Sequence, residues 1–155
     1  MFFIFQLWLS SKNYEMAAIN PQIRLKNLSL SFGSGMFKAM SDESRLRILN
    51  LMIENEMVCI SDLELVLDFT QTKTSRHMGY LKNAGLVVST KVDQWVFYKI
   101  KDEVYEIVRQ VLSYLKKDQT LQKDQEAYEV MYSNRELAAF QFESRSWKGL
   151  MRGEQ

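Results

Sequence analysis

Residues 71–84 carry the pattern of a short amphipathic helix, and the strand pattern of residues 88–100 follows almost at once. Within the helix, Thr74, Met78 and Leu81 recur at spacings of four and three, so they share one face. We expect that face to be buried. A helix with one buried face that leads directly into a hairpin is the arrangement by which a winged helix grips DNA.

Both ends of this helix are marked. Thr70 is suited to accept hydrogen bonds from the free amides of the first turn, and Gly85 is suited to end the helix in a left-handed conformation. The face opposite the buried one consists of Gln71, Thr72, Lys73, Ser75, Arg76 and Tyr80. Donors, acceptors and cations with so little aliphatic bulk suit a DNA major groove.

The hairpin is predicted from its strand-forming residues, which are Val88, Trp95, Phe97 and Ile100. The polar segment 91–94 lies between the two runs and contains no Asn-Gly or Asp-Gly turn. We therefore expect a loop of several residues rather than a tight turn. Lys91 and Gln94 would then project at its tip and reach the DNA backbone beside the groove.

Positive charge is concentrated in the same region. The whole chain carries a net charge of only +1, but residues 69–101, which include Lys82, hold six basic residues against one acidic residue, a net charge of +5. Residues 24–68 and 118–155 each hold five basic and seven acidic residues, a net charge of −2. A charged helix face is usually only a solvated one. The order of a capped helix, a hairpin and local positive charge favours double-stranded DNA as the partner.

The composition predicts one globular domain with its own core. The chain has 155 residues, 46% of them hydrophobic and 25% charged, with one proline, one cysteine and no low-complexity tract. A single cysteine excludes disulfide bonds within the chain and fits a reducing, cytoplasmic setting. One cysteine and one histidine do not make a nucleophile with its base and orienting group, so we expect no enzymatic activity.

The first nine residues, MFFIFQLWL, form an apolar run that is too short to span a bilayer, which needs about 20 residues. The run also lacks the basic start of a signal peptide, so no membrane association is expected. Residues 1–19 therefore form either a hydrophobic arm that packs on a partner or a segment before the true start at Met16. The sequence leaves both open.

Three helices are predicted before residue 71. A first helix would begin at Asn20-Pro21, with a bend or break at Gly33 and Gly35, and a short one would span residues 60–67. The apolar positions of the first helix are Leu25, Leu28, Phe32, Met36 and Met40. A helix capped by residues 41–43 carries Leu46, Ile48, Leu49 and Met52.

The helix that starts at Asp102 has a broad apolar stripe of Val104, Ile107, Val108, Val111, Leu112 and Leu115. Such a stripe at a domain edge either covers its own domain or invites a partner. We favour a homodimer in which this helix and the first one pack across a two-fold axis. Residues 20–117 would then form a single domain for DNA binding and dimerisation.

Residues 118–155 form a C-terminal extension. Ser133 and Glu136 match a capping box, which predicts a further helix there. The extension is too aromatic for a disordered tail, with Tyr128, Met131, Tyr132, Phe140, Phe142 and Trp147. We expect these side chains to pack on the rest of the protein; the alternative is a lid or pocket for an organic effector.

Several strings together resemble the ArsR-type (ArsR/SmtB) winged-helix bacterial transcription regulators. They are MFKAMSDESRLRILNLM, ISDLELVL, TQTKTSRHMGYLKNAGLV and QWVFYKI, and the resemblance covers roughly residues 36–117. It implies a winged helix-turn-helix, mainly α-helical with a small β-hairpin wing, in a homodimeric repressor bound to an inverted-repeat operator. By this resemblance Gln71, Ser75, Arg76 and His77 lie at or near the groove.

His77 adjoins the buried stripe, so a structural hydrogen bond is as plausible for it as a DNA contact. The family's best-known metal site has two cysteines one residue apart, where this chain reads Cys59-Ile60-Ser61. A serine hydroxyl is a poor ligand for soft metals, and the last helix of the domain has no histidine. We therefore expect neither a metal site nor a cofactor.

The sequence thus favours a sequence-specific DNA-binding repressor. Two alternatives remain: a winged helix that binds another protein, and a regulator that responds to a small organic effector. A protein-binding helix would more often present aliphatic or aromatic anchors than Lys73 and Arg76 beside Gln71. The sequence identifies no effector.

Overall fold

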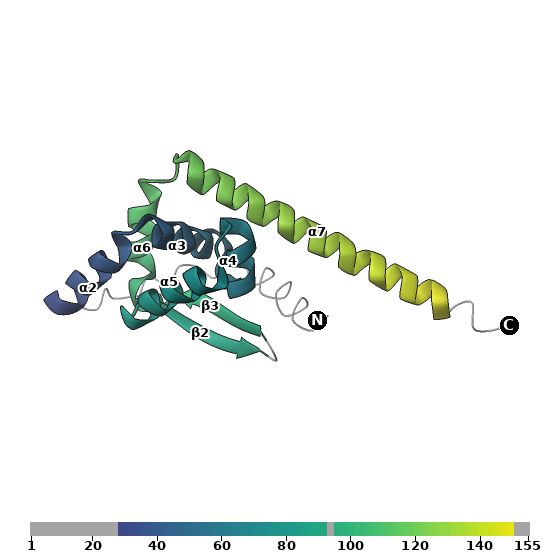
Figure 1. The fold of residues 1–155 in the computed structure, drawn as a ribbon, viewed down its shortest axis with the longest axis horizontal. Helices are drawn as coiled ribbons and strands as arrows, with labels where there is room; N and C mark the ends of the chain where they lie inside the picture. The colour runs from purple at the N-terminus through teal and green to yellow at the C-terminus, as the bar shows by residue number, and fades with distance from the viewer. Residues whose placement is uncertain (1–27, 93–94, 151–155) are drawn as a thin grey trace.

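The computed structural model describes residues 28–92 and 95–150, with residues 92, 95 and 135–150 described by their backbone alone. In order, they form α2 (Leu30–Met40), α3 (Glu43–Asn55), β1 (Met57–Cys59), α4 (Ile60–Leu67), α5 (Gln71–Asn83), β2 (Val87–Val92), β3 (Trp95–Ile100), α6 (Asp102–Ser113) and α7 (Gln119–Leu150). Figure 1 shows a helical body above a small sheet, with α7 running across the body and beyond it. The predicted winged helix-turn-helix is confirmed. Residues 1–19 and the expected helix start at Asn20-Pro21 lie outside the described residues.

Helix α5 has the two ends that the sequence predicts. The Thr70 hydroxyl accepts from the amide of Lys73 at 3.2 Å. At the other end Gly85 has a φ of 77°, and the amides of Gly85 and Leu86 donate to the carbonyls of Lys82 and Leu81. This pair of hydrogen bonds closes the helix as a Schellman motif, which explains why glycine occupies the left-handed position.

The predicted inner face of α5 is buried. Thr74, Met78 and Leu81 have exposed fractions of 0%, 2% and 0%. Around them the core is built mainly from α3, α4, β2 and α6, with Ile48, Leu49, Leu51, Met52, Leu63, Leu86, Val87, Val104 and Val108 among its buried side chains. Because these residues fix one face of α5, the opposite face has a defined direction.

The N-terminal helices agree with the sequence only in part. Asp42 caps α3 as predicted, since its carboxylate accepts from the amide of Arg45 at 2.9 Å. Helix α2, however, begins after Ser29, so Leu28 is not part of it. It also runs through Gly33 and Gly35 without the break that the sequence allowed. Glycine costs a helix about 1 kcal/mol relative to alanine, and burial of the C-terminal half of α2 offsets that cost.

The three strands form an antiparallel sheet in the order β1-β3-β2. Strand β1 was not predicted, because a three-residue strand between helices has too few residues for an alternating pattern. The hairpin is also tighter than expected. Val92 pairs with Trp95, so only residues 93 and 94 connect the paired strands, and the prediction of a longer loop is wrong. Val92 and Trp95 are residues that favour strands, and their pairing extends the ladder into the polar segment that was expected to form the loop.

Helix α7 is one continuous element from Gln119, so the predicted capping box at Ser133 is wrong. No glycine or proline interrupts residues 119–148, and Ser133 lies inside the helix, where it cannot act as an N-cap. The cap is instead Asp118, whose carboxylate accepts from the amides of Thr120 and Leu121.

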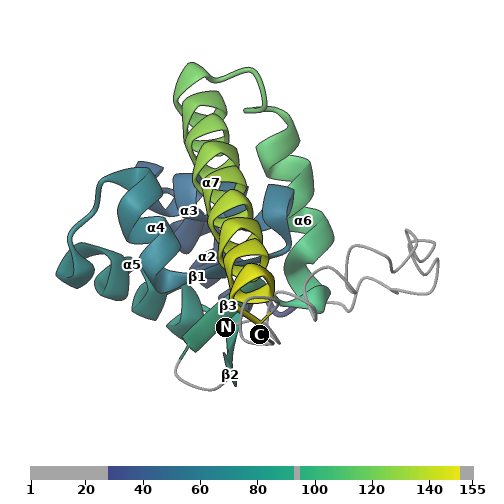
Figure 2. The same ribbon diagram turned by 90° about the vertical axis from the view of Figure 1, so that its right-hand side faces the viewer.

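The first half of α7 belongs to the core. Leu121 and Tyr128 are buried, and Met131 and Tyr132 pack against the core cluster, as the packing alternative predicts. The rings of Tyr128 and Tyr132 stack with centroids 5.6 Å apart. Figure 2, which looks along α7, shows α4 on one side of it and α6 on the other. The side chains of Phe140, Phe142 and Trp147 lie outside the described residues. Over the described ranges, no helix has both the length and the apolar character needed to cross a bilayer.

Candidate nucleic-acid interface

The outer face of α5 is polar, cationic and exposed. Five of the predicted contact residues lie on it with exposed side chains: Gln71, Thr72, Ser75, Arg76 and Tyr80. Their spacing places them opposite the buried stripe of α5. The major groove of DNA is wide enough to admit an α-helix, and side chains in such a row could then reach the edges of the bases.

Lys73, at the margin of this face, is held by an aromatic ring. Its side chain is half-buried, and Nζ lies 3.5 Å from the centroid of the Phe69 ring. An ammonium group above an aromatic face is attracted by the negative charge density of the ring. Lys73 therefore has a preferred position beside the first turn of α5.

The wing joins the end of α5. Lys82, exposed in the last turn of α5, donates from Nζ to the Ser89 hydroxyl of β2 at 3.3 Å. Lys91 lies further along β2 and is exposed. The contact brings helix and hairpin cations to the same side of the domain. Gln94, the other predicted tip residue, lies outside the described residues.

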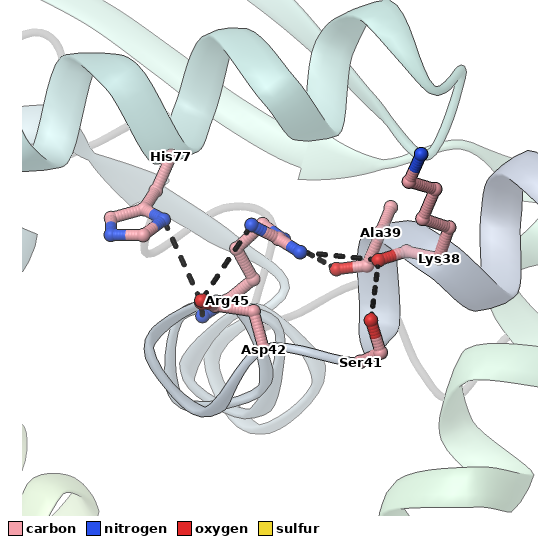
Figure 3. A network of polar contacts seen from close by, with 6 residues as sticks. All are labelled: Lys38, Ala39, Ser41, Asp42, Arg45 and His77. Carbon is pink, nitrogen blue, oxygen red and sulfur yellow. Dashed lines mark hydrogen bonds and ion pairs between the residues drawn. The ribbon is translucent and has the colours of Figure 1, made fainter.

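His77 turns away from the exposed face of α5. It is 7% exposed, and its Nδ1 lies 3.6 Å from Oδ1 of Asp42, at the start of α3 (Figure 3). Its ring centroid is 6.2 Å from that of Phe69. Of the two roles that the sequence left open for His77, this placement supports the structural one.

Arg45 links the same corner to α5. Its guanidinium donates to the carbonyls of Lys38 and Ala39 at the end of α2, as Figure 3 shows, and it forms an ion pair with Asp42. The same guanidinium carbon lies 4.2 Å from the centroid of the Tyr80 ring on α5. The sequence does not indicate this contact, because nothing in the string SRLR shows that Arg45 faces α5.

Arg47, two residues further along α3, lies beside the turn that precedes α5. It donates to the carboxylate of Asp124 on α7 from Nε at 2.7 Å and from Nη2 at 2.8 Å. Its guanidinium carbon is 5.3 Å from the centroid of the Phe69 ring. These hydrogen bonds and the adjacent carboxylate raise the pKa of Arg47 further above its ordinary value, so it is always charged.

Burial lowers the pKa of His77 below its ordinary value of 6.5. The nearby carboxylate of Asp42 acts in the opposite direction, while the cations of Arg76, Arg45 and Lys73 lower the pKa further. The contact with Asp42 is therefore a contact of neutral imidazole at neutral pH. It becomes an ion pair only after the ring is protonated at lower pH.

Cys59 lies at the end of β1, directly before α4. It is buried, and the Ser61 hydroxyl donates to its sulfur at 3.3 Å. In the part of the chain that the structure describes, no three His, Cys, Asp or Glu side chains lie together in a way that could hold a metal ion.

Comparison with known proteins gives matches to bacterial and archaeal transcription regulators. Residues 42–89 match the model of the family described as "Bacterial regulatory protein, arsR family". An uncharacterized HTH-type transcriptional regulator of Methanocaldococcus jannaschii is 40% identical over 77 residues, which are 49% of this chain and 86% of that protein. The chain belongs to the arsR family. Its winged-helix domain is therefore of the kind found in this family of transcription regulators.

Other members of the arsR family match the same region. The arsenical resistance operon repressor of Escherichia coli is 38% identical over 69 residues, 44% of this chain and 59% of the repressor. Across several cadmium and arsenic resistance regulators, the aligned part spans 54% to 66% of their own length. The structure of HlyU from Vibrio cholerae is 29% identical, with a TM-score of 0.51 over 54% of this chain and 91% of HlyU. The family match ends before α6 and α7 begin.

The lowered pKa of His77 predicts a pH-dependent stability. A neutral buried imidazole stabilises the folded state fully above about pH 6.5, and this contribution is lost as pH falls through the lowered pKa, because the unfolded chain binds the proton first. Between about pH 7.5 and about pH 5.5, the melting temperature of the parent should therefore drop more than that of His77→Gln. Equal drops would mean that His77 does not titrate in this window.

Proposed function

We propose that the protein is a homodimeric repressor that binds an inverted-repeat operator through α5 and the wing, and that it is not a metal sensor. The observation that carries the proposal is the exposed polar and cationic face of α5 beside the cations of the hairpin. Membership of the arsR family supports DNA as the partner, and the name of the Escherichia coli relative supports repression. A cytoplasmic location follows from this role.

Recognition would divide between α5 and its surroundings. Gln71, Thr72, Ser75 and Arg76 present amide, hydroxyl and guanidinium groups in the first half of the helix, which suits hydrogen bonding to base edges. Lys82 and Lys91 would contact phosphates and supply affinity that falls with salt. His77 would support the helix from behind rather than touch DNA.

Exposed apolar side chains on α2 and after α6 support the homodimer. Leu30 and Phe37 are 92% and 59% exposed and lie seven residues apart, hence on one face of α2. Tyr114 and Leu115, directly after α6, are also exposed. In Figure 1 both helices lie toward the end of the molecule opposite the free end of α7. Apolar surface of this kind at one end of a domain is what a two-fold interface covers.

The donor set near Cys59 argues against a soft-metal sensor. Cys59 offers one buried thiol, and its neighbour Ser61 offers a hydroxyl that already donates to that sulfur. Cadmium and arsenic bind best where several thiolates converge, and one thiol does not provide this. We therefore infer that repression is relieved by something other than the metals in the names of its relatives.

The decisive experiment is fluorescence anisotropy with the region upstream of the protein's own gene and a scrambled duplex, at two salt concentrations. Tighter, salt-sensitive binding to the native duplex is expected. Equal, weak binding to both duplexes would overturn the proposal and favour a winged helix that binds another protein. A reporter gene behind the bound region then tests repression against activation.

Arg76→Ala and Lys91→Ala should have different effects in this assay. Loss of the Arg76 guanidinium should weaken operator binding by about 1–3 kcal/mol and relax the preference at one base step. Lys91→Ala should weaken binding to all sequences alike and lower the salt slope by about 1. Lys123→Ala, an exposed lysine on α7, is the control and should change neither. The same loss on specific and scrambled DNA for both variants would contradict this division.

Phe37→Glu should convert the dimer to a monomer, because it buries a charge in the proposed apolar interface. Light scattering after size exclusion measures the mass directly. Leu65→Glu is the control, since Leu65 is 67% exposed but lies on α4, outside this interface. A parent protein that is itself monomeric, or a Phe37 variant that stays dimeric, would disprove the interface.

Cys59→Ser should bind and release DNA like the parent. Serine is only slightly smaller than cysteine, and its hydroxyl can also accept a hydrogen bond from Ser61, so the variant should fold like the parent. The measurement is operator anisotropy with added zinc or arsenite. Dissociation of the parent complex but not of the Cys59 variant would show a thiol-dependent metal response, contrary to the proposal.

A further inference from the structure

The C-terminal helix α7 lies beyond the part of the chain that matches the arsR family, yet its first half is bonded to the DNA-binding domain. Asp124 is 5% exposed, and its carboxylate receives two hydrogen bonds from Arg47 of α3. One residue further on, the amides of Gln125 and Asn55 exchange hydrogen bonds at 2.9 and 3.2 Å. Helices α3 and α7 are therefore joined at two adjacent polar contacts of different kinds.

Within the described part of the chain, the contact of Asp124 with Arg47 is the one that continues toward α5. The guanidinium of Arg47 also lies against the ring of Phe69, in the turn between α4 and α5. Phe69 is 8% exposed, and the same ring carries the ammonium of Lys73 at 3.5 Å. The chain of contacts thus runs from Asp124 through Arg47 and Phe69 to the first turn of α5. Among the described residues, the other hydrogen bonds of Asn55 and Gln125 go to Leu51 and Glu129 and not toward α5.

We propose that Asp124 is a positioning residue for DNA recognition and acts through Arg47 and Phe69. It fixes the Arg47 guanidinium, which with Lys73 holds the Phe69 ring, and this ring fixes the beginning of α5. The inference rests on the proposed function, because it concerns the placement of the same recognition helix. It assigns to α7 a role in DNA binding that requires no contact between α7 and DNA.

The physical basis is the difference between a fixed and a free guanidinium. Two charge-assisted hydrogen bonds hold the planar Arg47 group in one orientation, and a side chain with four rotatable bonds has many others without them. The cap at Thr70 and the burial of Met78 and Leu81 do not depend on Asp124, so α5 would still form. Its first turn, where Gln71 and Thr72 lie, would lose its lateral support.

Simple electrostatics predicts the opposite sign, and this makes the proposal testable. Asp124 is an anion in a protein that binds a polyanion, so its neutralisation should raise the affinity for any DNA. Positioning predicts instead that Asp124→Asn lowers the affinity for the operator. A loss confined to the specific duplex therefore identifies a positioning effect rather than a change of charge.

The experiment is operator anisotropy with the full chain, at a temperature where circular dichroism shows each variant to be folded. Asp124→Asn should bind the operator about fivefold to tenfold more weakly and leave binding to the scrambled duplex within about twofold. Arg47→Lys keeps the charge but loses the paired hydrogen bonds, so it should show the same loss and serves if the first variant fails to fold. Gln125→Ala, which removes the neighbouring contact between the same helices, is the matched control and should bind like the parent.

A double-mutant comparison tests the route through the ring. In a Phe69→Leu background, Asp124→Asn should cause no further loss of operator affinity. The proposal is overturned if Asp124→Asn binds the operator as tightly as the parent or more tightly, if Gln125→Ala loses as much, or if the loss persists without Phe69. A parent protein that does not distinguish the operator from the scrambled duplex would instead disprove the proposed function, which keeps the two failures apart.

Discussion

Burial of one stripe of α5 is the constraint on which the rest of the molecule depends. Thr74, Met78 and Leu81 are buried where α5 packs on α3, α4 and β2, so α5 has no freedom to rotate about its axis. A rotation would expose apolar side chains and bury Arg76. The outward direction of the polar face is thus a consequence of the core, and the sequence features of the core and of the interface are two sides of one helix.

Two arginines of α3 hold α5 at its flanks. Arg45 and Arg47 are two residues apart, which places them on nearly opposite sides of the helix. The guanidinium of Arg45 lies against the Tyr80 ring near the corner between α2 and α3, and that of Arg47 lies beside Phe69 in the turn before α5. Each is anchored by an acidic residue, Asp42 or Asp124. The exposed helix is therefore supported by guanidinium groups whose own orientation is fixed elsewhere.

Local rules explain which parts the sequence could predict. The caps at Asp42, Thr70 and Gly85 and the inner stripe of α5 depend on residues a few positions apart, so they are visible in the chain. Strand β1 exists only because β3 pairs with it, and the contact between Arg47 and Asp124 joins residues 77 positions apart. No local pattern indicates such pairs. The predicted helix start at Ser133 was wrong for a related reason, since its motif is meaningful only where the preceding segment is not already helical.

The pairing of Val92 with Trp95 has a consequence for how this wing can vary. Two residues separate the paired positions Val92 and Trp95, so the paired strands extend almost to the tip of the hairpin. Inserting one residue into β2 before Lys91, with the pairing at the base of the hairpin kept, would shift Lys91 against its partner Val96 and exchange the face of its side chain. Lys91 would then turn from its exposed side toward the opposite face of the sheet. Because side chains alternate with a period of two, inserting two residues in each strand keeps both the pairing and the faces, so the hairpin can be lengthened in this way without turning Lys91.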